Sequence, residues 1–338
     1  MIYYLLVAFV VLLSLALTFG LRRYAVARNL IDVPNSRSSH VIPTPRGGGV
    51  AIVFSFLLAN VVLLAMGMIS SPFFMAVFFP GILVAILGFV DDHGHVSARW
   101  RLLGHFAAAL WVLFCFGDSP SISIAGFVIS SWYVCGFLAV FYLVWMINLY
   151  NFMDGIDGLA SVEALTVTLS AAFLYWLMGM EDLIWAPLIM AASVSGFLFF
   201  NFPPARIFMG DAGSGFIGLM LGVLSVSGAM AAPQLLWGWM ILLGVFIVDA
   251  TYTLGWRLLR GEKIYEAHRS HAYQSASRIH GSHMFVTVAV GLINLLWLLP
   301  LAALVTFSKL EGSLALVIAY LPLIFLARRY RAGMPETV

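Results

Sequence analysis

The chain has 338 residues, of which 62% are hydrophobic and only 9% are charged. Soluble domains carry about 25% charged residues, so this composition excludes a water-soluble protein and predicts a chain embedded in lipid. The formal net charge of +2 gives no indication of a nucleic-acid partner. Cys115 and Cys135 stand apart, without a CxxC motif or a disulfide framework, so the cysteines indicate no chemistry.

Long apolar runs predict a single all-α domain, residues 1–338, that crosses the membrane many times. Each transmembrane helix needs about 20 apolar residues. The first run lacks a positively charged leader and a small-residue cleavage site, which favours a retained helix over a signal peptide. Segment 118–130 is either an outer loop or a short re-entrant segment. The runs predict ten or eleven transmembrane helices, at 2–20, 48–68, 73–90, 102–117, 131–150, 159–179, 184–202, 212–231, 235–256, 284–306 and 312–327.

Basic residues predict the orientation, because Lys and Arg stay on the cytoplasmic side. If the N-terminus is outside and the C-terminus is cytoplasmic, every Lys and Arg except Lys309 lies in an inner loop or the inner tail. Most acidic residues and histidines fall on the same side, so the predicted site faces the cytoplasm. The predicted cytoplasmic loops are 21–47, 91–101, 148–158, 203–211 and 257–283.

Segment 40–49 reads His-Val-Ile-Pro-Thr-Pro-Arg-Gly-Gly-Gly and leads into an apolar run. The prolines fix the approach to the helix. The glycines permit either close packing of a small-residue helix face or close approach of a phosphate. His40 and Arg46 are candidate substrate-binding residues in this segment.

Asp91 and Asp92 end the third apolar run. Adjacent residues on a helix point about 100° apart, so one carboxylate could face a metal ion and the other a substrate. Alternatively, the two are solvated loop acids paired with Arg99 or Arg101.

Segment 148–159 reads Asn-Leu-Tyr-Asn-Phe-Met-Asp-Gly-Ile-Asp-Gly-Leu. Asn148, Asn151, Asp154 and Asp157 are spaced by three, and residues three apart share a face in helical geometry. Asn, Asp and Gly are also the usual residues of a polar turn between helices. Four amides and carboxylates in register favour a functional site.

Segment 208–215 reads Phe-Met-Gly-Asp-Ala-Gly-Ser-Gly and opens an apolar run. Backbone N–H groups at a helix start suit a phosphate, which makes Gly210 a candidate substrate-binding residue. Asp211 could hold a divalent ion there. The alternative is an ordinary capped helix start, in which Asp or Ser satisfies the free N–H groups.

The longest inner loop contains His268-Arg269-Ser270-His271. Zinc binding is one interpretation, but no cysteine or HExxH motif accompanies the histidines. Anion binding by His268, Arg269 and His271 fits a phosphate-rich site better. Asp249 lies inside an apolar run, where an acidic residue is either functional or a hydrogen-bonded structural group.

Carboxylates that share a site with Arg, His and glycine-rich backbone predict a particular chemistry. Carboxylates repel a phosphate unless a divalent cation lies between them. Mg²⁺ binds one or two carboxylates together with substrate phosphates. A site at the membrane edge meets a soluble nucleotide and a lipid at once, so a lipid phosphate could attack a nucleotide pyrophosphate.

The acidic pair and the three polar segments resemble the motifs of the polyprenyl-phosphate N-acetylhexosamine-1-phosphate transferase superfamily, whose members include the WecA and MraY enzymes. The resemblance covers about residues 29–285, with the motifs in the same order. The run His-Arg-Ser-His-Ala-Tyr-Gln departs from the histidine-rich motif of the MraY branch. Together with Pro-Asn-Ser-Arg-Ser-Ser-His before the prolines, it looks closest to WbpL-type enzymes, which begin O-antigen assembly.

This resemblance implies a reaction and roles for individual residues. The donor would be a UDP-N-acetylhexosamine of the GlcNAc or FucNAc type, the acceptor undecaprenyl phosphate in the bacterial inner membrane, and the by-product UMP. Mg²⁺, or Mn²⁺ in its place, would be the cofactor; a homodimer is left open. Implied catalytic residues are Asp91, as base, and Asp92; implied metal ligands are Asp211 and Asn151; implied substrate-binding residues are Asn148, Asp154, Asp157, His268, Arg269, His271, Gly210, Arg46 and His40.

Two other classes use similar parts. A nucleotide-sugar or polyprenyl-lipid transporter would share the spans, but transporters typically bind their substrates near the bilayer centre between repeated halves. No repeat is visible here, and the polar residues gather on one face. The CDP-alcohol phosphatidyltransferases also use Asp–Gly motifs with metal, but their further spaced Asp residues and Ala-Arg pair are absent from 148–170.

Overall fold

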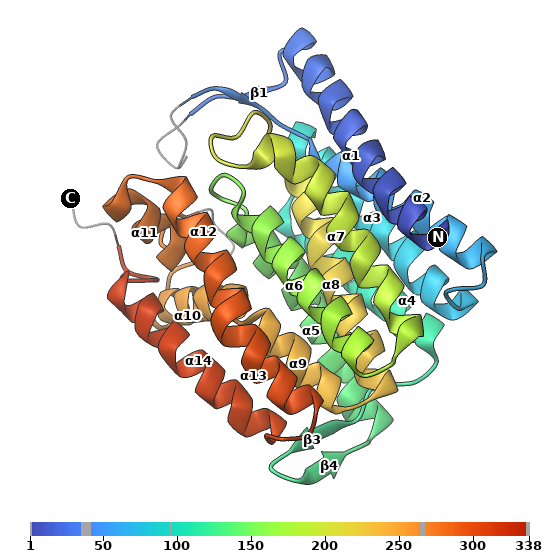
Figure 1. The fold of residues 1–338 in the computed structure, drawn as a ribbon. Helices are drawn as coiled ribbons and strands as arrows, with labels where there is room; N and C mark the ends of the chain where they lie inside the picture. The colour runs from blue at the N-terminus through green and yellow to red at the C-terminus, as the bar shows by residue number, and fades with distance from the viewer. Residues whose placement is uncertain (1, 35–41, 95, 264–267, 336–338) are drawn as a thin grey trace.

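The computed structural model describes residues 2–34, 42–94, 96–263 and 268–335, so the candidate residue His40 lies outside the described residues. The fold is a bundle of helices with two short antiparallel hairpins, β1 (Ile31–Asp32) with β2 (Thr44–Pro45) and β3 (Ile122–Ile124) with β4 (Phe127–Ile129) (Figure 1). The helices are α1 (Ile2–Ala27), α2 (Gly49–Ala65), α3 (Ser71–Gly94), α4 (Ala98–Phe116), α5 (Trp132–Met153), α6 (Leu159–Leu177), α7 (Glu181–Asn201), α8 (Asp211–Ala231), α9 (Gln234–Leu242), α10 (Gly244–Leu259), α11 (Ala272–His280), α12 (His283–Ile293), the π-helical turn η1 (Asn294–Leu298), α13 (Leu299–Thr306) and α14 (Gly312–Arg329).

The structure supports a polytopic membrane protein, although the count of eleven spans is not confirmed. Within the described residues, eight helical segments are long and apolar enough to cross a membrane, and α9 with α10 makes a ninth if this pair, bent by 73°, is one broken span. The other two predicted spans are helical but do not qualify. Helix α2 has only 17 residues, and α4 carries Arg99 and Arg101 in its first turn.

Segment 118–130 contains a β-hairpin, and no re-entrant helix forms there. Strands β3 and β4 are joined by Ala125 and Gly126, whose φ values are +48° and +86°. Two consecutive residues with positive φ are typical of a tight two-residue hairpin turn. The indole N–H of Trp237, on α9, donates to the carbonyl of Ser123 at 2.8 Å and fixes the hairpin against the bundle.

Helix α8 runs through the centre of the bundle, and its small residues allow neighbouring backbones to approach closely. A Cβ added at Gly218 would lie 2.4 Å from the carbonyl oxygen of Met146 on α5. One at Gly88 on α3 would lie 2.4 Å from the carbonyl oxygen of Asp211. Small residues at helix contacts are the usual means of close packing in membranes. This packing brings the end of α3 against the start of α8.

The polar motifs collect at one end of the bundle. Figure 1 shows β1, the connections that follow α5 and α7, and α11 at this end, whereas the β3–β4 hairpin lies at the opposite end. Several motifs that are more than 100 residues apart in sequence therefore share one region, as the sequence predicted.

One acidic residue is buried among the helices, away from the polar end. Glu163, on α6, is fully buried, and its Oε2 accepts a hydrogen bond from Asn294 Nδ2 at 2.7 Å. The same amide donates to Thr166 Oγ1 at 2.8 Å. Glu163 Oε1 has no hydrogen-bond partner among the described residues. Because Asn294 begins η1, this contact connects α6 to the point where the span formed by α12, η1 and α13 changes its helical geometry.

The effect of replacing Glu163 on stability is expected to depend on whether the new side chain can accept the hydrogen bond from Asn294. Glu163→Ala removes an acceptor from Asn294 and leaves a cavity, which should cost about 2–4 kcal/mol. Glu163→Gln keeps both the acceptor and the volume, so its thermal midpoint in detergent should equal or exceed that of the unchanged protein. A Glu163→Ala variant with an unchanged midpoint would show that the contact contributes nothing.

Candidate active site

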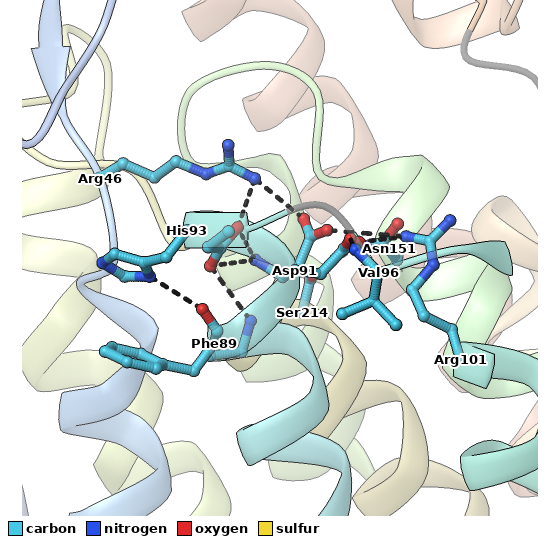
Figure 2. A network of polar contacts seen from close by, with 11 residues as sticks. Arg46, Phe89, Asp91, His93, Val96, Arg101, Asn151 and Ser214 are labelled. Atoms are coloured by element: carbon cyan, nitrogen blue, oxygen red, sulfur yellow. Dashed lines mark hydrogen bonds and ion pairs between the residues drawn. The ribbon is translucent and has the colours of Figure 1, made fainter.

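Three segments bring the acidic residues of the motifs together. Asp91 and Asp92 lie in the last turn of α3, and Asp211 is the first residue of α8. Arg46, just before α2, pairs with Asp92, and its Nη2 lies 3.2 Å from Asp211 Oδ1. Figure 2 shows Arg46 and Arg101 on opposite sides of Asp91. Two guanidinium groups thus neutralise part of a cluster of three carboxylates.

Asp92 caps the start of α8. Its side chain is 4% exposed, and its two oxygens accept the backbone N–H of Asp211 at 3.1 and 3.0 Å. Gly210 has φ +78°, and a Cβ there would lie 2.6 Å from Asp92 Oδ2, so only glycine lets the carboxylate reach the helix start. The sequence predicted that the backbone N–H groups at the start of α8 would suit a phosphate. In the structure they are already paired with a carboxylate from α3.

Asp91 is held from two sides. Its Oδ1 accepts the backbone N–H of Val96 at 2.7 Å, and its Oδ2 pairs with Arg101. Arg101 Nη1 also lies 3.9 Å from Asp211 Oδ2. Of the two arginines considered from the sequence, the partner is Arg101. If Asp91 takes a proton during a reaction, Arg101 must first move away from Oδ2. It could do so by pairing with a substrate phosphate instead.

The four residues spaced by three in segment 148–157 do not act as one row. Helix α5 ends at Met153, so Asn148 and Asn151 lie on the helix and Asp154 and Asp157 lie beyond it. Asn151 Nδ2 donates to Ser214 Oγ at 3.1 Å. Asp157 turns toward other elements and accepts the N–H of Ala205 at 3.0 Å.

Two cavities meet at the carboxylate cluster. An almost entirely apolar cavity of about 440 Å³ lies between α3, α4 and α5, and Asn148 and Asn151 line it together with Asp91 and Arg101. A polar cavity of about 210 Å³ lies among the loops, lined by Asp154, Asp157, Arg46 and Gly210. Asp211 lines both cavities.

Among the described residues of the loop, His268, Arg269 and His271 line neither of these two cavities. His271 is 2% exposed and is the N-cap residue just before α11, and its Nδ1 lies 3.2 Å from Asp249 Oδ1. Burial, followed by the nearby His271 and Arg257, lowers the pKa of His268 to about 3. The His268 imidazole is therefore neutral, which weakens the sequence argument that it binds anions.

Asp249 is a hydrogen-bonded structural group, which is one of the two interpretations that the sequence allowed. Its Oδ1 accepts the N–H of Ala272 at 2.9 Å, and its Oδ2 accepts that of Tyr273 at 2.9 Å. The carboxylate thereby caps the first turn of α11 from within α10. Tyr273 in turn donates its hydroxyl to the carbonyl of Phe152 at 3.0 Å. Asp249 thus connects α11 to the end of α5.

Sequence reasoning missed several polar residues that line the cavities. His105 faces the apolar cavity, and Asp32, Gln274 and His283 line the polar one. His283 Nδ1 lies 3.2 Å from an oxygen of Asp157. A signal for His105 existed in the sequence: it follows Arg101 by four residues and so shares its helix face.

The donor atoms of the carboxylate cluster fit the chemistry of a hard divalent cation. Among the described residues, no group of three or more His, Cys, Asp or Glu side chains is placed to hold a metal ion. Mg²⁺ binds one or two protein carboxylates and takes its other ligands from water and phosphate. Asp211, beside Asn151 and between two cavities, supplies oxygen donors of this kind.

Asp154 is an acid whose charge depends on pH in the neutral range. Burial raises its pKa to about 7, and the nearby carboxylate of Asp211 adds to this effect while Arg46 opposes it. The carboxyl group is therefore largely protonated below pH 7 and negatively charged above it. It lines the polar cavity, where this change alters the charge that a bound anion meets.

Comparison with known proteins agrees with this architecture. Residues 74–229 match the model of glycosyl transferase family 4. A probable undecaprenyl-phosphate N-acetylglucosaminyl 1-phosphate transferase of Bacillus subtilis is 31% identical over 329 residues, 95% of this chain and 89% of the relative. A decaprenyl-phosphate N-acetylglucosaminephosphotransferase of Mycolicibacterium smegmatis is 32% identical, over 70% of this chain and 65% of the relative.

The similarity extends to a second branch of these enzymes. A phospho-N-acetylmuramoyl-pentapeptide-transferase of Bacillus pumilus is 32% identical over 224 residues, 61% of this chain and 66% of the relative. The Bacillus subtilis protein is similar over nearly its whole length, so the relationship is not confined to a shared segment. The chain belongs to glycosyl transferase family 4, within the superfamily of polyprenyl-phosphate N-acetylhexosamine-1-phosphate transferases that includes WecA and MraY.

Proposed function

We propose that this protein transfers N-acetylhexosamine-1-phosphate from a UDP-sugar to undecaprenyl phosphate and releases UMP. The observation that carries the proposal is the position of Asp211 between an apolar cavity and a polar cavity. A reaction between a lipid and a nucleotide needs one site that both can reach. Membership of the family sets the transporter alternative aside.

The apolar cavity suits the first isoprene units of the lipid. Its walls include Leu102 and Phe141, which are 45% and 48% exposed. A chain from the membrane can therefore enter between α4 and α5. At the end of this cavity, Arg101 lies where it can pair with the phosphate of such a lipid.

The polar cavity suits the nucleotide diphosphate. Arg46 lies at its boundary with the carboxylate cluster, and neighbouring carboxylates raise its pKa above the usual value, so it remains a cation. Asp157 and Gln274 supply acceptors and donors for the base or the sugar. This assignment supports roles for Asp154, Asp157 and Gly210 in donor binding.

The bond changes follow from these positions. An oxygen of the lipid phosphate attacks the phosphorus that carries the sugar, and the bond from that phosphorus to the bridging oxygen breaks. UMP leaves with the electron pair of that bond. If the lipid phosphate enters as a monoanion, Asp91 takes its proton. Arg46 and Arg101 neutralise the phosphates and hold them in line.

A divalent cation, when bound, offsets the charge of the diphosphate as the leaving group departs. Asp211 and Asn151 are the residues proposed to hold it, and Mg²⁺ is proposed over Mn²⁺. Their oxygen donors and the few protein ligands match magnesium's preference for phosphate and water as remaining ligands.

The finer assignment is an enzyme that initiates O-antigen or a related surface polysaccharide in the bacterial inner membrane. UDP-GlcNAc is proposed as a donor, in line with the names of two relatives. A 6-deoxy donor such as UDP-FucNAc is proposed from the WbpL-like segments 34–49 and 268–274.

The test is a reaction of purified protein with undecaprenyl phosphate, Mg²⁺ and a panel of UDP-sugars, with UMP and the lipid product both measured. UMP should form only with acceptor and a UDP-N-acetylhexosamine, cease in EDTA and return with Mg²⁺ or Mn²⁺. Full turnover in chelator would rule out the metal, and exclusive use of UDP-MurNAc-pentapeptide would rule out the donor class.

Donor binding should depend on pH through Asp154. Its pKa of about 7 means that the neutral form, which does not repel phosphate, disappears as the pH rises. The Kd for a UDP-N-acetylhexosamine, measured without acceptor, should rise by about tenfold between pH 6 and pH 8, equivalent to roughly 1.4 kcal/mol. Asp154→Asn should remove this dependence. An identical pH profile in the variant would assign the effect to another group.

The proposed orientation places the site on the cytoplasmic face. Single cysteines at positions 270 and 309, in a background without Cys115 and Cys135, should react with an impermeant reagent from opposite sides. Position 309 should label from the periplasm and position 270 only after the membrane is opened. Periplasmic labelling at 270 would reverse the topology.

A further inference from the structure

The apolar cavity contains a second polar level, which consists of His105 and Asn148. Helix α4 begins near the carboxylate cluster, whereas α5 runs toward it and ends there. His105 follows Arg101 by four residues and Asn148 precedes Asn151 by three. At about 1.5 Å per residue, both lie roughly one helical turn further from the polar end. Apart from this pair, the polar lining residues are those of the cluster and Asn151.

The contact between the two side chains determines where the imidazole carries its proton. Asn148 Nδ2 donates to the carbonyl of Val144 at 2.7 Å, which fixes the amide orientation. The same Nδ2 lies 3.2 Å from His105 Nδ1. An amide nitrogen donates but does not accept, so Nδ1 must be the acceptor. The proton of the neutral ring is then on Nε2.

This arrangement leaves a donor available in an apolar cavity. Among the described residues, the contact with Asn148 is the one hydrogen bond of His105, so the Nε2 of this cavity-lining ring has no acceptor from the protein. A donor without an acceptor in apolar surroundings costs free energy. A ligand that places an acceptor oxygen at this depth would remove that cost.

We propose that the His105–Asn148 pair recognises the phosphate of the lipid acceptor, with His105 Nε2–H donating to a phosphate oxygen. The inference rests on the proposed function, because it takes the occupant of the apolar cavity to be the phosphate monoester of a long-chain alcohol. The pair lies between the cluster and apolar residues such as Phe106 and Trp145. In the proposed reaction, the phosphate would join the first isoprene unit at this depth. The pair thereby selects polyprenyl phosphate over the alcohol.

A binding experiment without turnover tests this role. Farnesyl phosphate and farnesol serve as probes, and Kd is measured from thermal stabilisation of the purified protein in detergent. The unchanged protein should prefer farnesyl phosphate. His105→Phe keeps an aromatic ring but removes the donor, so this preference should fall by about tenfold. His105→Gln restores an N–H donor and should retain most of it.

Kinetics separate recognition from a merely structural contact between α4 and α5. In His105→Phe, the KM for undecaprenyl phosphate should rise about tenfold, while the KM for the UDP-sugar stays unchanged. Phe114→Leu, on the same helix at a position 77% exposed, is the matched control and should resemble the unchanged protein. A structural role would lower stability without altering the preference between the two probes.

The outcomes distinguish this inference from the proposed function. If His105→Phe keeps the full preference for farnesyl phosphate, the His105–Asn148 pair does not recognise the phosphate. The proposal of a lipid phosphate as acceptor would be unaffected by this result. If the unchanged protein binds farnesol as tightly as farnesyl phosphate, the acceptor class itself is wrong. Should His105→Phe not fold, Asn148→Asp provides the same test, because a carboxylate there would repel the phosphate and weaken its binding.

Discussion

Asp211→Asn is expected to lower kcat by about 10³-fold. Losing one group that stabilises charge in a transition state typically lowers kcat by about 10²–10³-fold, roughly 2.7–4 kcal/mol, since each 1.4 kcal/mol is about tenfold in rate. The lost charge faces both Arg46 and Arg101, at 3.2 and 3.9 Å. The variant also loses the carboxylate proposed to hold Mg²⁺.

The fold should survive this change, because the cap of α8 uses the backbone N–H of residue 211 and the side chain of Asp92. Expression and thermal midpoint should therefore match those of the unchanged protein. Asp118→Asn is the control. Asp118 is exposed and follows α4, and among the described residues its side chain bonds only to the neighbouring Ser119. Normal turnover in Asp211→Asn would remove Asp211 from the mechanism.

Asp91→Asn is expected to lower kcat by about 10²–10⁴-fold, the usual contribution of a general base. UDP-sugar binding should be nearly unchanged, because Asp91 lines the apolar cavity and not the polar one. The second pKa of a phosphate monoester is about 6, so a rising pH supplies the dianion without a base. The loss should therefore be partly recovered between pH 6 and pH 8.

Two results would assign Asp91 differently. Rescue of Asp91→Asn by added Mg²⁺ rather than by higher pH would make it a metal ligand. Unchanged turnover at both pH values would exclude it as the base. Asp92 would then be a poor replacement, because both its oxygens are occupied by the start of α8 and by Arg46. Loss of activity in Asp92→Asn would reflect the position of α8.

The sequence predicted the helical architecture well, because apolar runs of membrane length have few other solutions. It also grouped the acidic motifs correctly at one end of the bundle. It could not show that Asn148 and Asp157 face different cavities, since that depends on α5 ending at Met153. The hairpin at 122–129 was missed because its two-residue Ala125-Gly126 turn lacks the common Asn-Gly signal.

The sequence also did not predict the roles of polar residues inside apolar runs. Glu163 and His105 are each surrounded in sequence by hydrophobic residues. Composition therefore assigns both residues to transmembrane helices and does not distinguish them from their neighbours. Their partners, Asn294 and Asn148, lie 131 and 43 positions away. Only the packing of distant helices reveals such pairs. The same holds for Asp249, whose capping role depends on a helix that begins 23 residues later.

The separate approaches to Asp211 have a consequence for the order of binding. In the proposed reaction, the lipid would enter sideways beside Leu102 and Phe141, and the nucleotide would enter from the loops near Asp154. Neither substrate would then block the path of the other, so either could bind first. UMP would return to water, and the lipid product would return to the bilayer without its isoprene chain leaving hydrocarbon.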